Sequence, residues 1–194
     1  MDNKELEKKI VPIAEEGVIL LEKGDYEKAV KKFEEVLEIE AKLPYVKVNL
    51  GICYMNLKKY DLAEKIFKEV IEKLPDEFTA HYHLGLNYYY SHKHEEALKE
   101  CQRALEIRPN SHMAINTLGV IAGYRGDIEE EIKCYKKAIE LNPDSIEAYI
   151  NLAYAYEKDF NDEEAIKYFK KVIEMDPDGK YVDEARDMLK DLGA

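Results

Sequence analysis

Residues 78–111 read FTAHYHLGLNYYYSHKHEEALKECQRALEIRPNS, and the pattern of this segment indicates its secondary structure. Its first half carries apolar side chains at helical spacing, and its second half does so again after a polar break at Ser91-His92-Lys93. Pro109 follows the second apolar run, at a place where proline cannot continue a helix. The stretch therefore predicts two amphipathic helices joined by a turn and followed by a proline.

The same pattern recurs along the chain with a period of 34 residues. Prolines stand at this spacing, at Pro75, Pro109, Pro143 and Pro177. A leucine followed by a small residue also recurs, at Leu50-Gly51, Leu84-Gly85, Leu118-Gly119 and Leu152-Ala153. Bulky residues form a third series, at Phe33, Phe67, Cys101, Tyr135 and Phe169. Because one such unit cannot bury its apolar face alone, we expect the units to stack on one another.

This unit resembles the tetratricopeptide repeat. Residues 78–111 match the pattern of that family most fully, through Leu84, Gly85, Tyr88, Ala97, Ala104 and Pro109. The resemblance implies an all-α fold, a right-handed superhelical α-solenoid of stacked antiparallel helix pairs. It implies five units, at residues 10–43, 44–77, 78–111, 112–145 and 146–179. The first unit is degenerate, with Glu16 at the leucine position and Ala41 in place of proline.

The two ends of the chain predict different structures. Residues 180–194 predict a C-terminal capping helix whose inner face carries Val182, Ala185, Leu189 and Leu192. Residues 1–9 are a highly charged N-terminal extension. Since Pro12 suits the first turn of a helix better than its interior, we expect residues 1–9 to form a separate helical turn or a frayed end.

The charge of the chain excludes some classes of partner. It has 29 Lys and Arg against 41 Asp and Glu, a net charge of -12. This balance disfavours nucleic acid and anionic membrane surfaces, and it favours basic partners. No apolar run is long enough to cross a membrane, and no signal peptide is visible at the start. Cys53, Cys101 and Cys134 are far apart and odd in number, which predicts reduced, buried thiols in a cytoplasmic protein.

The family resemblance implies a concave groove lined by the first helix of each unit. Positions 2, 5, 6, 9, 12 and 13 of a unit face it, and here they are rich in tyrosine and aliphatic residues, with a few amides. We expect this surface to bind a peptide or helix from a partner protein. The expected groove residues are Tyr45, Asn49, Ile52, Tyr82, His83, Leu86, Tyr89, Tyr90, Asn116, Val120, Gly123, Tyr124, Asn151 and Tyr154. Two alternatives remain: a tight superhelix covers much of this surface, or the protein's own terminus fills it.

The unit at residues 112–145 departs from the pattern. Ala122 replaces a tyrosine, Gly123 follows it, and Glu131 replaces the small alanine of the facing helix. One interpretation is a pocket with Gly123 as its floor and Tyr89, Tyr90, Val120 and Tyr124 as its walls, so that Gly123→Leu would leave stability unchanged or higher. The alternative is that Glu131 reaches solvent beside a slightly loose helix pair.

One binding mode of the family is excluded by residue type. Members that grip the acidic tails of chaperones use Lys or Arg at positions 2 and 6 of a unit. None of the five units has Lys or Arg at either position. We therefore do not expect binding to such tails.

No catalytic or metal-binding set emerges. All five histidines fall between His81 and His112, but a helix of about 14 residues separates the ends on which they lie by roughly 20 Å. Ser91, Ser111 and Ser145 fall at helix junctions, where serine caps helices. We expect no metal, no cofactor and no enzyme activity. The predicted function is a protein–protein interaction module or adaptor, monomeric or weakly self-associating; the alternative is a self-assembling scaffold that uses the same groove or the termini.

Overall fold

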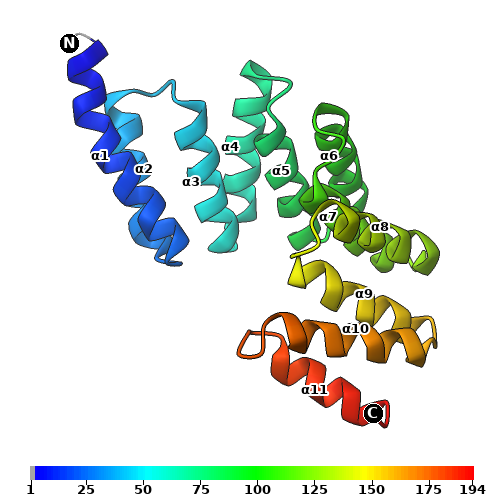
Figure 1. The fold of residues 1–194 in the computed structure, drawn as a ribbon. Helices are drawn as coiled ribbons and strands as arrows, with labels where there is room; N and C mark the ends of the chain where they lie inside the picture. Colours follow the sequence, from blue (N-terminus) through cyan, green and yellow to red (C-terminus); the bar gives the residue numbers. More distant parts are fainter. Residues whose placement is uncertain (1–2) are drawn as a thin grey trace. The chain divides into compact units, whose positions relative to one another are not determined.

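The computed structural model describes residues 3–194, and within that range its regular structure consists of eleven α-helices without a strand (Figure 1). The all-α prediction is thereby confirmed. The helices are α1 (Asn3–Glu22), α2 (Tyr26–Ile39), α3 (Pro44–Asn56), α4 (Tyr60–Lys73), α5 (Phe78–Tyr90), α6 (His94–Ile107), α7 (His112–Tyr124), α8 (Ile128–Leu141), α9 (Ile146–Lys158), α10 (Asp162–Met175) and α11 (Val182–Asp191).

The sequence period sets where the helices begin. The first helix of four successive pairs starts at Pro44, Phe78, His112 and Ile146, each 34 residues after the last. Two consecutive helices pack against each other in every pair, from α1 with α2 to α9 with α10. Short turns join them, and Gly24 and Gly126 adopt the left-handed backbone (φ 79° and 78°) that these turns require. Lys58, His92 and Phe160 adopt the same left-handed backbone at the equivalent places.

Within a pair, a glycine lets a bulky residue of the second helix come close. A Cβ atom added to Gly51 of α3 would lie 2.6 Å from Cε1 of Phe67 on α4, a distance that real side chains do not tolerate. Phe67 is fully buried there, which contributes about 2 kcal/mol of hydrophobic stabilisation. The recurrence of glycine and a bulky residue in the sequence thus corresponds to one packing contact repeated from pair to pair.

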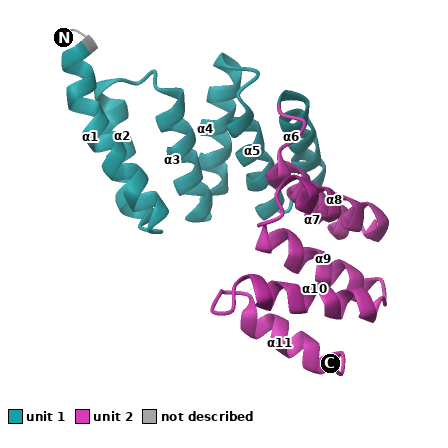
Figure 2. Cartoon of the chain, viewed as in Figure 1, with its two compact units in different colours: residues 1–107 teal, residues 108–194 magenta. Residues whose placement is uncertain are grey.

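On a larger scale than the 34-residue repeats, the chain divides into two compact parts (Figure 2). The part that ends at Ile107 is called the first unit from here on, and the part that begins at Arg108 is called the second unit. In the first unit, each helix from α1 to α6 packs on the next, and α3 also contacts α1 and α5. Phe33, Val36 and Leu50 belong to its core. In the second unit, α7 to α11 pack in chain order, and α7 contacts α9. Leu152, Phe169 and Val172 belong to its core.

The expected break before Pro12 is wrong. Helix α1 is continuous from Asn3 to Glu22 and contains Pro12 in its interior. The apolar stripe explains this, because Leu6 and Ile10 lie on the N-terminal side of Pro12 and pack into the same core as Ile13. Burial of these side chains offsets the cost of about 3 kcal/mol that an interior proline imposes. Residues 1 and 2 of the expected extension lie outside the described residues.

The C-terminal helix α11 packs against α10. It buries Val182, Ala185 and Leu189, while Asp183, Arg186 and Asp187 are exposed. Its outward face is therefore charged, as the last element of a helical stack requires. None of the helices described between residues 3 and 194 is long and apolar enough to cross a membrane.

Candidate functional site

Helices α3 and α5 of the first unit carry expected groove residues and lie next to each other. On α3, Tyr45 is 66% exposed and Ile52 is partly buried. Val48, one turn after Tyr45, is buried beneath this surface. A tyrosine thus stands out over an aliphatic floor, an arrangement that gives a ligand both contact area and a polar hydroxyl tip.

A hollow of about 350 Å³ opens between the beginnings of α3 and α5. Its lining residues are Pro44, Tyr45, Val48, Asn49, Glu77 and Thr79. The carboxylate of Glu77 accepts a hydrogen bond from the backbone N–H of Thr79 (3.1 Å) and caps α5. The sequence analysis did not name Pro44 and Glu77, because they lie where one 34-residue repeat joins the next rather than at a groove position.

Asn49 lines this hollow and carries an unsatisfied donor. The residue is only 7% exposed, and the Nδ2 atom of its side chain is buried without a hydrogen-bond partner. A buried amide N–H that makes no hydrogen bond costs about 1–3 kcal/mol, which a carbonyl acceptor would recover. The structure therefore brings two expected groove residues, Tyr45 and Asn49, to one hollow, and the Nδ2 donor of Asn49 is buried beside it without a partner.

The middle of α5 is an aromatic cluster rather than an open surface. The ring of Tyr82 stacks on that of Phe78 with centroids 5.9 Å apart, and its centroid lies 5.0 Å from that of His83. His83 also stacks on Phe67 of α4 at 6.1 Å. Burial lowers the pKa of His83 to about 4, so the ring is neutral at pH 7. His83 therefore contributes packing to this aromatic cluster rather than charge.

The C-terminal end of α5 presents further tyrosines. Tyr90 is half exposed, and its ring centroid lies 5.3 Å from that of Tyr89. Tyr89 in turn contacts His94 of α6 at 5.9 Å. Leu86, one turn earlier, is partly buried. The expected groove residues of α5 thus form an aromatic and aliphatic strip along one helix.

In the second unit, the expected groove amides are already engaged. Asn151 of α9 donates a hydrogen bond from Nδ2 to Oδ1 of Asn116 on α7 (3.4 Å). Asn116 donates in turn to the carboxylate of Glu147 (3.4 Å). The hydroxyl of Tyr154 donates to Glu184 (2.6 Å), and burial together with this carboxylate raises the pKa of Tyr154. Tyr124 is exposed and Val120 is partly buried.

The space beside Gly123 is not empty in the second unit, because the carboxylate of Glu131 fills it. A Cβ atom added to Gly123 would collide with this carboxylate. The alternative, with Glu131 in solvent, is wrong, since Glu131 is only 3% exposed. Lys158 pairs with it (Nζ to Oε1, 3.0 Å), and the hydroxyl of Tyr135 donates to it at 3.4 Å. Gly123 is the next-to-last residue of α7 and provides the room for a buried carboxylate.

The other candidate groups have structural partners. His81 lies between the carboxylate of Glu100 (2.7 Å) and the backbone carbonyl of Pro75 (3.0 Å). Ser111 and Ser145 cap α7 and α9, accepting from backbone N–H groups as predicted. Among residues 3–194 no group of three or more His, Cys, Asp or Glu is arranged to hold a metal ion.

The three cysteines are unpaired and buried. Burial raises the pKa of Cys53 and Cys101 to about 12 and that of Cys134 to about 11. Since the thiolate is the nucleophile and the metal ligand, these thiols are poorly suited to either role.

Comparison with known families agrees with the geometry. Models of the tetratricopeptide repeat match residues 20–87, 78–111 and 146–178, and a TPR repeat model matches residues 124–159. Together these ranges cover most of the sequence. The chain belongs to the tetratricopeptide repeat family. A search of curated proteins found no significant match.

Solved structures share the fold. One is TTC0263, described as a thermophilic TPR protein in Thermus thermophilus, with a TM-score of 0.85 and 20% identity over 93% of this chain and 98% of that one. Another is MamA 41-end from Desulfovibrio magneticus RS-1, with a TM-score of 0.71 and 23% identity over 89% and 97%. A crystal structure of MamA has a TM-score of 0.68 and 27% identity over 83% and 94%. The family and these neighbours support a protein-interaction or scaffold module.

Proposed function

We propose that this chain is a non-enzymatic interaction module or adaptor that binds a peptide or helix of a partner protein along α3 and α5 of its first unit. One observation carries the proposal: Asn49, whose buried Nδ2 donor has no partner, lines a hollow beside the exposed ring of Tyr45. An enzyme would need a reacting set of side chains, whereas a binding surface needs only contact area and a few oriented polar groups.

The chemistry of the hollow favours a peptide backbone as ligand. A backbone carbonyl is an acceptor without charge, so it can satisfy the N–H of Asn49 without the cost of burying an ion. Val48 provides an apolar floor for a neighbouring side chain, and the ring of Tyr45 can close over that side chain. Tyrosine loses little conformational entropy on binding, which makes it an effective anchor.

The strip along α5 sets the length of the ligand. A helix of 13 residues is about 20 Å long, since each residue rises about 1.5 Å. An extended peptide of about six residues spans the same distance. Tyr82, Leu86 and the pair Tyr89 and Tyr90 then lie along its course beyond the Asn49 hollow. The corresponding residues of the second unit (Asn116, Val120, Gly123, Tyr124, Asn151 and Tyr154) are proposed as a second contact area, with their amides less available.

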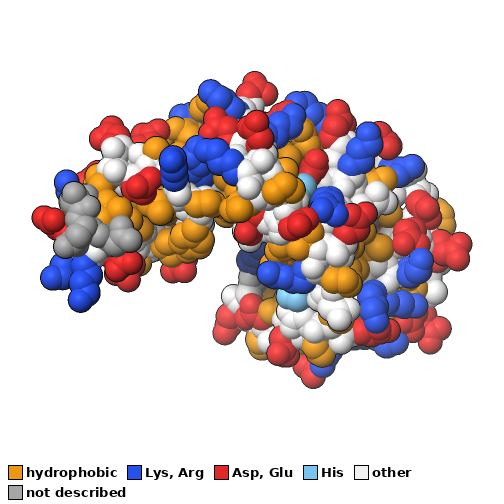
Figure 3. Space-filling view, turned by 90° about the horizontal axis from the view of Figure 1, so that it is seen from above, with side chains coloured by type: hydrophobic (Ala, Val, Ile, Leu, Met, Phe, Trp, Pro, Cys, Tyr) orange, Lys and Arg blue, Asp and Glu red, His pale blue; other side chains and the backbone are white. Residues whose placement is uncertain are grey.

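The charge of the chain favours a partner segment with basic character beside its apolar anchors. The net charge is -12, and acidic, basic and hydrophobic side chains are interspersed over the face drawn in Figure 3. Long-range attraction of this sign speeds association with basic proteins and opposes binding to nucleic acid. Three unpaired, buried thiols fit a reducing compartment, so we place the protein in the cytoplasm.

Capture of partners from a native cell extract tests this function. The wild type is compared with Tyr45→Ala/Tyr90→Ala, because both rings are exposed and their loss should not unfold the chain. The matched control is Phe160→Ala, which removes a ring that is 93% exposed in the second unit. The proposal expects a protein retained by the wild type and the control but lost from the double variant. Equal retention by all three proteins would exclude the first-unit groove.

Self-assembly is the remaining alternative, and the same variants address it. If the groove binds a second copy of this chain, the mass measured by light scattering rises with concentration in the wild type and not in Tyr45→Ala/Tyr90→Ala. A constant monomer mass rejects the scaffold and leaves the adaptor.

A further inference from the structure

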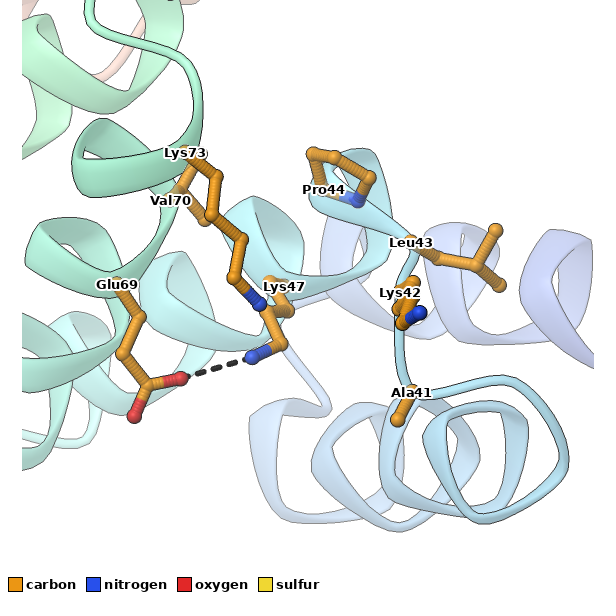
Figure 4. A pocket seen from close by; sticks show the side chains of 8 residues that line it. All are labelled: Ala41, Lys42, Leu43, Pro44, Lys47, Glu69, Val70 and Lys73. Atoms are coloured by element: carbon orange, nitrogen blue, oxygen red, sulfur yellow. Dashed lines mark hydrogen bonds and ion pairs between the residues drawn. The ribbon is translucent and has the colours of Figure 1, made fainter.

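A second hollow lies in the first unit, away from the Asn49 donor. Its volume is about 230 Å³, and it is bordered by the connection between α2 and α3, the start of α3 and the end of α4 (Figure 4). The lining residues are Ala41, Lys42, Leu43, Pro44, Lys47, Glu69, Val70 and Lys73. Apolar side chains thus meet three lysines and one glutamate. Only Pro44 is shared with the other hollow.

Comparison of the repeats explains why the hollow is cationic. Lys73 is the last residue of α4, and the four other second helices end instead at Ile39, Ile107, Leu141 and Met175. Lys47 likewise stands where the other 34-residue repeats have Ile13, His81, Ile115 and Tyr149. In the first pair, Ile13 and Ile39 both pack against the core. In the second pair, two lysines replace that apolar contact at both positions.

The positive charge at this hollow is only partly neutralised. Lys47 donates a hydrogen bond to Glu69 (2.8 Å), while the side chain of Lys73 runs from α4 toward Lys47 (Figure 4). The hydrogen bond from Lys47 lowers the pKa of Glu69, and the charges of Lys47, Lys65 and Lys73 act in the same direction.

Within the described residues, neither Lys42 nor Lys73 has its ammonium group in an ion pair. The carboxylate of Glu40 accepts a hydrogen bond from the backbone N–H of Lys42 (2.9 Å). The ammonium groups of Lys42 and Lys73 are therefore outside any ion pair at this hollow, although the net charge of the chain is -12.

The size and lining of the hollow define its occupant. Sites for whole small molecules measure about 300–1,000 Å³, so this hollow has room for less than a typical small ligand and suits a single side chain. Its floor is apolar, with Val70 fully covered and Leu43 and Pro44 beside it. We propose that it binds an acidic segment of a partner protein, taking one aliphatic side chain into the hollow and pairing the flanking carboxylates with Lys42 and Lys73. This site goes beyond the proposed groove and does not depend on it.

Lys73→Ile is the decisive variant. It restores the residue type of the other repeats at this position, so the fold should be retained, and it both fills the hollow and removes a charge. Lys73→Gln removes the charge while nearly keeping the length of the side chain. Lys99→Gln is the matched control, because Lys99 is exposed on α6 and distant in sequence from the hollow.

The probes are the peptides acetyl-Glu-Leu-Glu-amide, acetyl-Glu-Gly-Glu-amide and acetyl-Lys-Leu-Lys-amide, titrated into ¹⁵N-labelled full-length protein. We expect saturable shifts of the amide signals of residues 41–47 and 69–73 with the first peptide. Replacing its leucine by glycine, or Lys73 by Ile or Gln, should weaken binding by about tenfold. The lysine peptide should give no saturable shift at these residues, and the Lys99→Gln control should behave as the wild type.

Three results would overturn the proposal. One is the lack of any saturable shift at these residues with acetyl-Glu-Leu-Glu-amide. Another is equal binding of the acidic and the basic peptide. The third is unchanged affinity in both Lys73 variants, which would place the peptide elsewhere. None of these results affects capture through Tyr45 and Tyr90, so the two proposals fail separately.

Discussion

The carboxylate of Glu131 lies 3.0 Å from the ammonium group of Lys158, and this ion pair ties α8 to α9 inside the second unit. Glu131 is almost entirely buried, whereas Lys158 is about half exposed. The hydroxyl of Tyr135 contributes a further hydrogen bond to the same carboxylate. The equivalent residue in the other four 34-residue repeats is a small alanine (Ala29, Ala63, Ala97 or Ala165). One repeat therefore has a carboxylate where the others have a methyl group.

Removing the lysine alone should be costly. Lys158→Met leaves the buried carboxylate of Glu131 without its cation, and we expect the free energy of unfolding to fall by about 1–2 kcal/mol, less than for a fully buried pair because Lys158 reaches solvent. In Lys158→Met/Glu131→Ala most of this loss should be recovered. Urea denaturation of the wild type, Lys158→Met, Glu131→Ala and the double variant measures the coupling between the two side chains. Losses that simply add would show that the pair is not coupled.

Replacing Gly123 by alanine should destabilise the protein, which is the opposite of the usual effect of this substitution in a helix. Gly→Ala within a helix normally stabilises by about 1 kcal/mol. Here the new methyl group would collide with the carboxylate of Glu131, so Gly123→Ala should lower the melting temperature. In a Glu131→Ala background the same substitution should raise it. A gain in both backgrounds, measured by thermal circular dichroism, would mean that Glu131 moves aside at no cost.

His83 makes stability depend on pH. Burial lowers its pKa from 6.5 to about 4, so the unfolded chain binds a proton more readily than the folded one between these values. Stability should therefore be complete above pH 6.5 and fall as the pH drops toward 4. The loss attributable to His83 is about 2 kcal/mol at pH 5.

The comparison of His83→Phe with the wild type between pH 7.5 and 5 isolates this effect. Phenylalanine keeps the stack on Phe67 but does not titrate, so the variant should lose less stability on acidification. His92→Asn, at an exposed turn with φ 61°, should follow the wild type. Parallel curves for the wild type and His83→Phe would contradict the assignment.

Phe160 holds a strained turn between α9 and α10. Its φ is 55°, a left-handed value that Gly24 and Gly126 adopt at the equivalent turns. A residue with a Cβ atom pays roughly 1–2 kcal/mol for this conformation, and the exposed ring offers little packing in return. Phe160→Gly should therefore stabilise the protein by about 1 kcal/mol, and Phe160→Ala should not. Chemical denaturation separates the two outcomes.

The sequence predicts the helices well where spacing alone decides them. The 34-residue step of the prolines and leucines locates the starts at Pro44, Phe78, His112 and Ile146, because the same packing of a small residue against a bulky one recurs in each pair. It fails at Pro12, where burial of Leu6 and Ile10 outweighs the preference of proline for a first turn.

The site is less predictable than the fold. Whether Glu131 lies in solvent or in the protein depends on Lys158, which is 27 residues away and belongs to the next 34-residue repeat. The unpartnered donor of Asn49 cannot be predicted from the sequence either, since Asn151 occupies the same repeat position and its Nδ2 does find a partner. The sequence analysis did not single out Lys47 or Lys73, and only the structure shows that both line one hollow.

Asn49 should also separate binding from stability. Asn49→Leu removes a buried donor that has no partner, so we expect the free energy of unfolding to rise by about 1 kcal/mol. The same change removes the hydrogen bond proposed for the ligand's backbone. A variant that is more stable and binds less strongly would be the signature of a ligand-binding group, as measured by denaturation and by partner capture.

Site-specific photo-crosslinking from position 45 tests the central claim most directly. Benzoylphenylalanine replaces Tyr45, which is exposed at the edge of the Asn49 hollow, and in a second protein it replaces Phe160 as a control. We predict that position 45 crosslinks to a partner protein in native extract, that Asn49→Leu suppresses this crosslink, and that position 160 does not form it. The same crosslinks from both positions, or a crosslink from position 45 that survives Asn49→Leu undiminished, would contradict the claim that this hollow is a binding site.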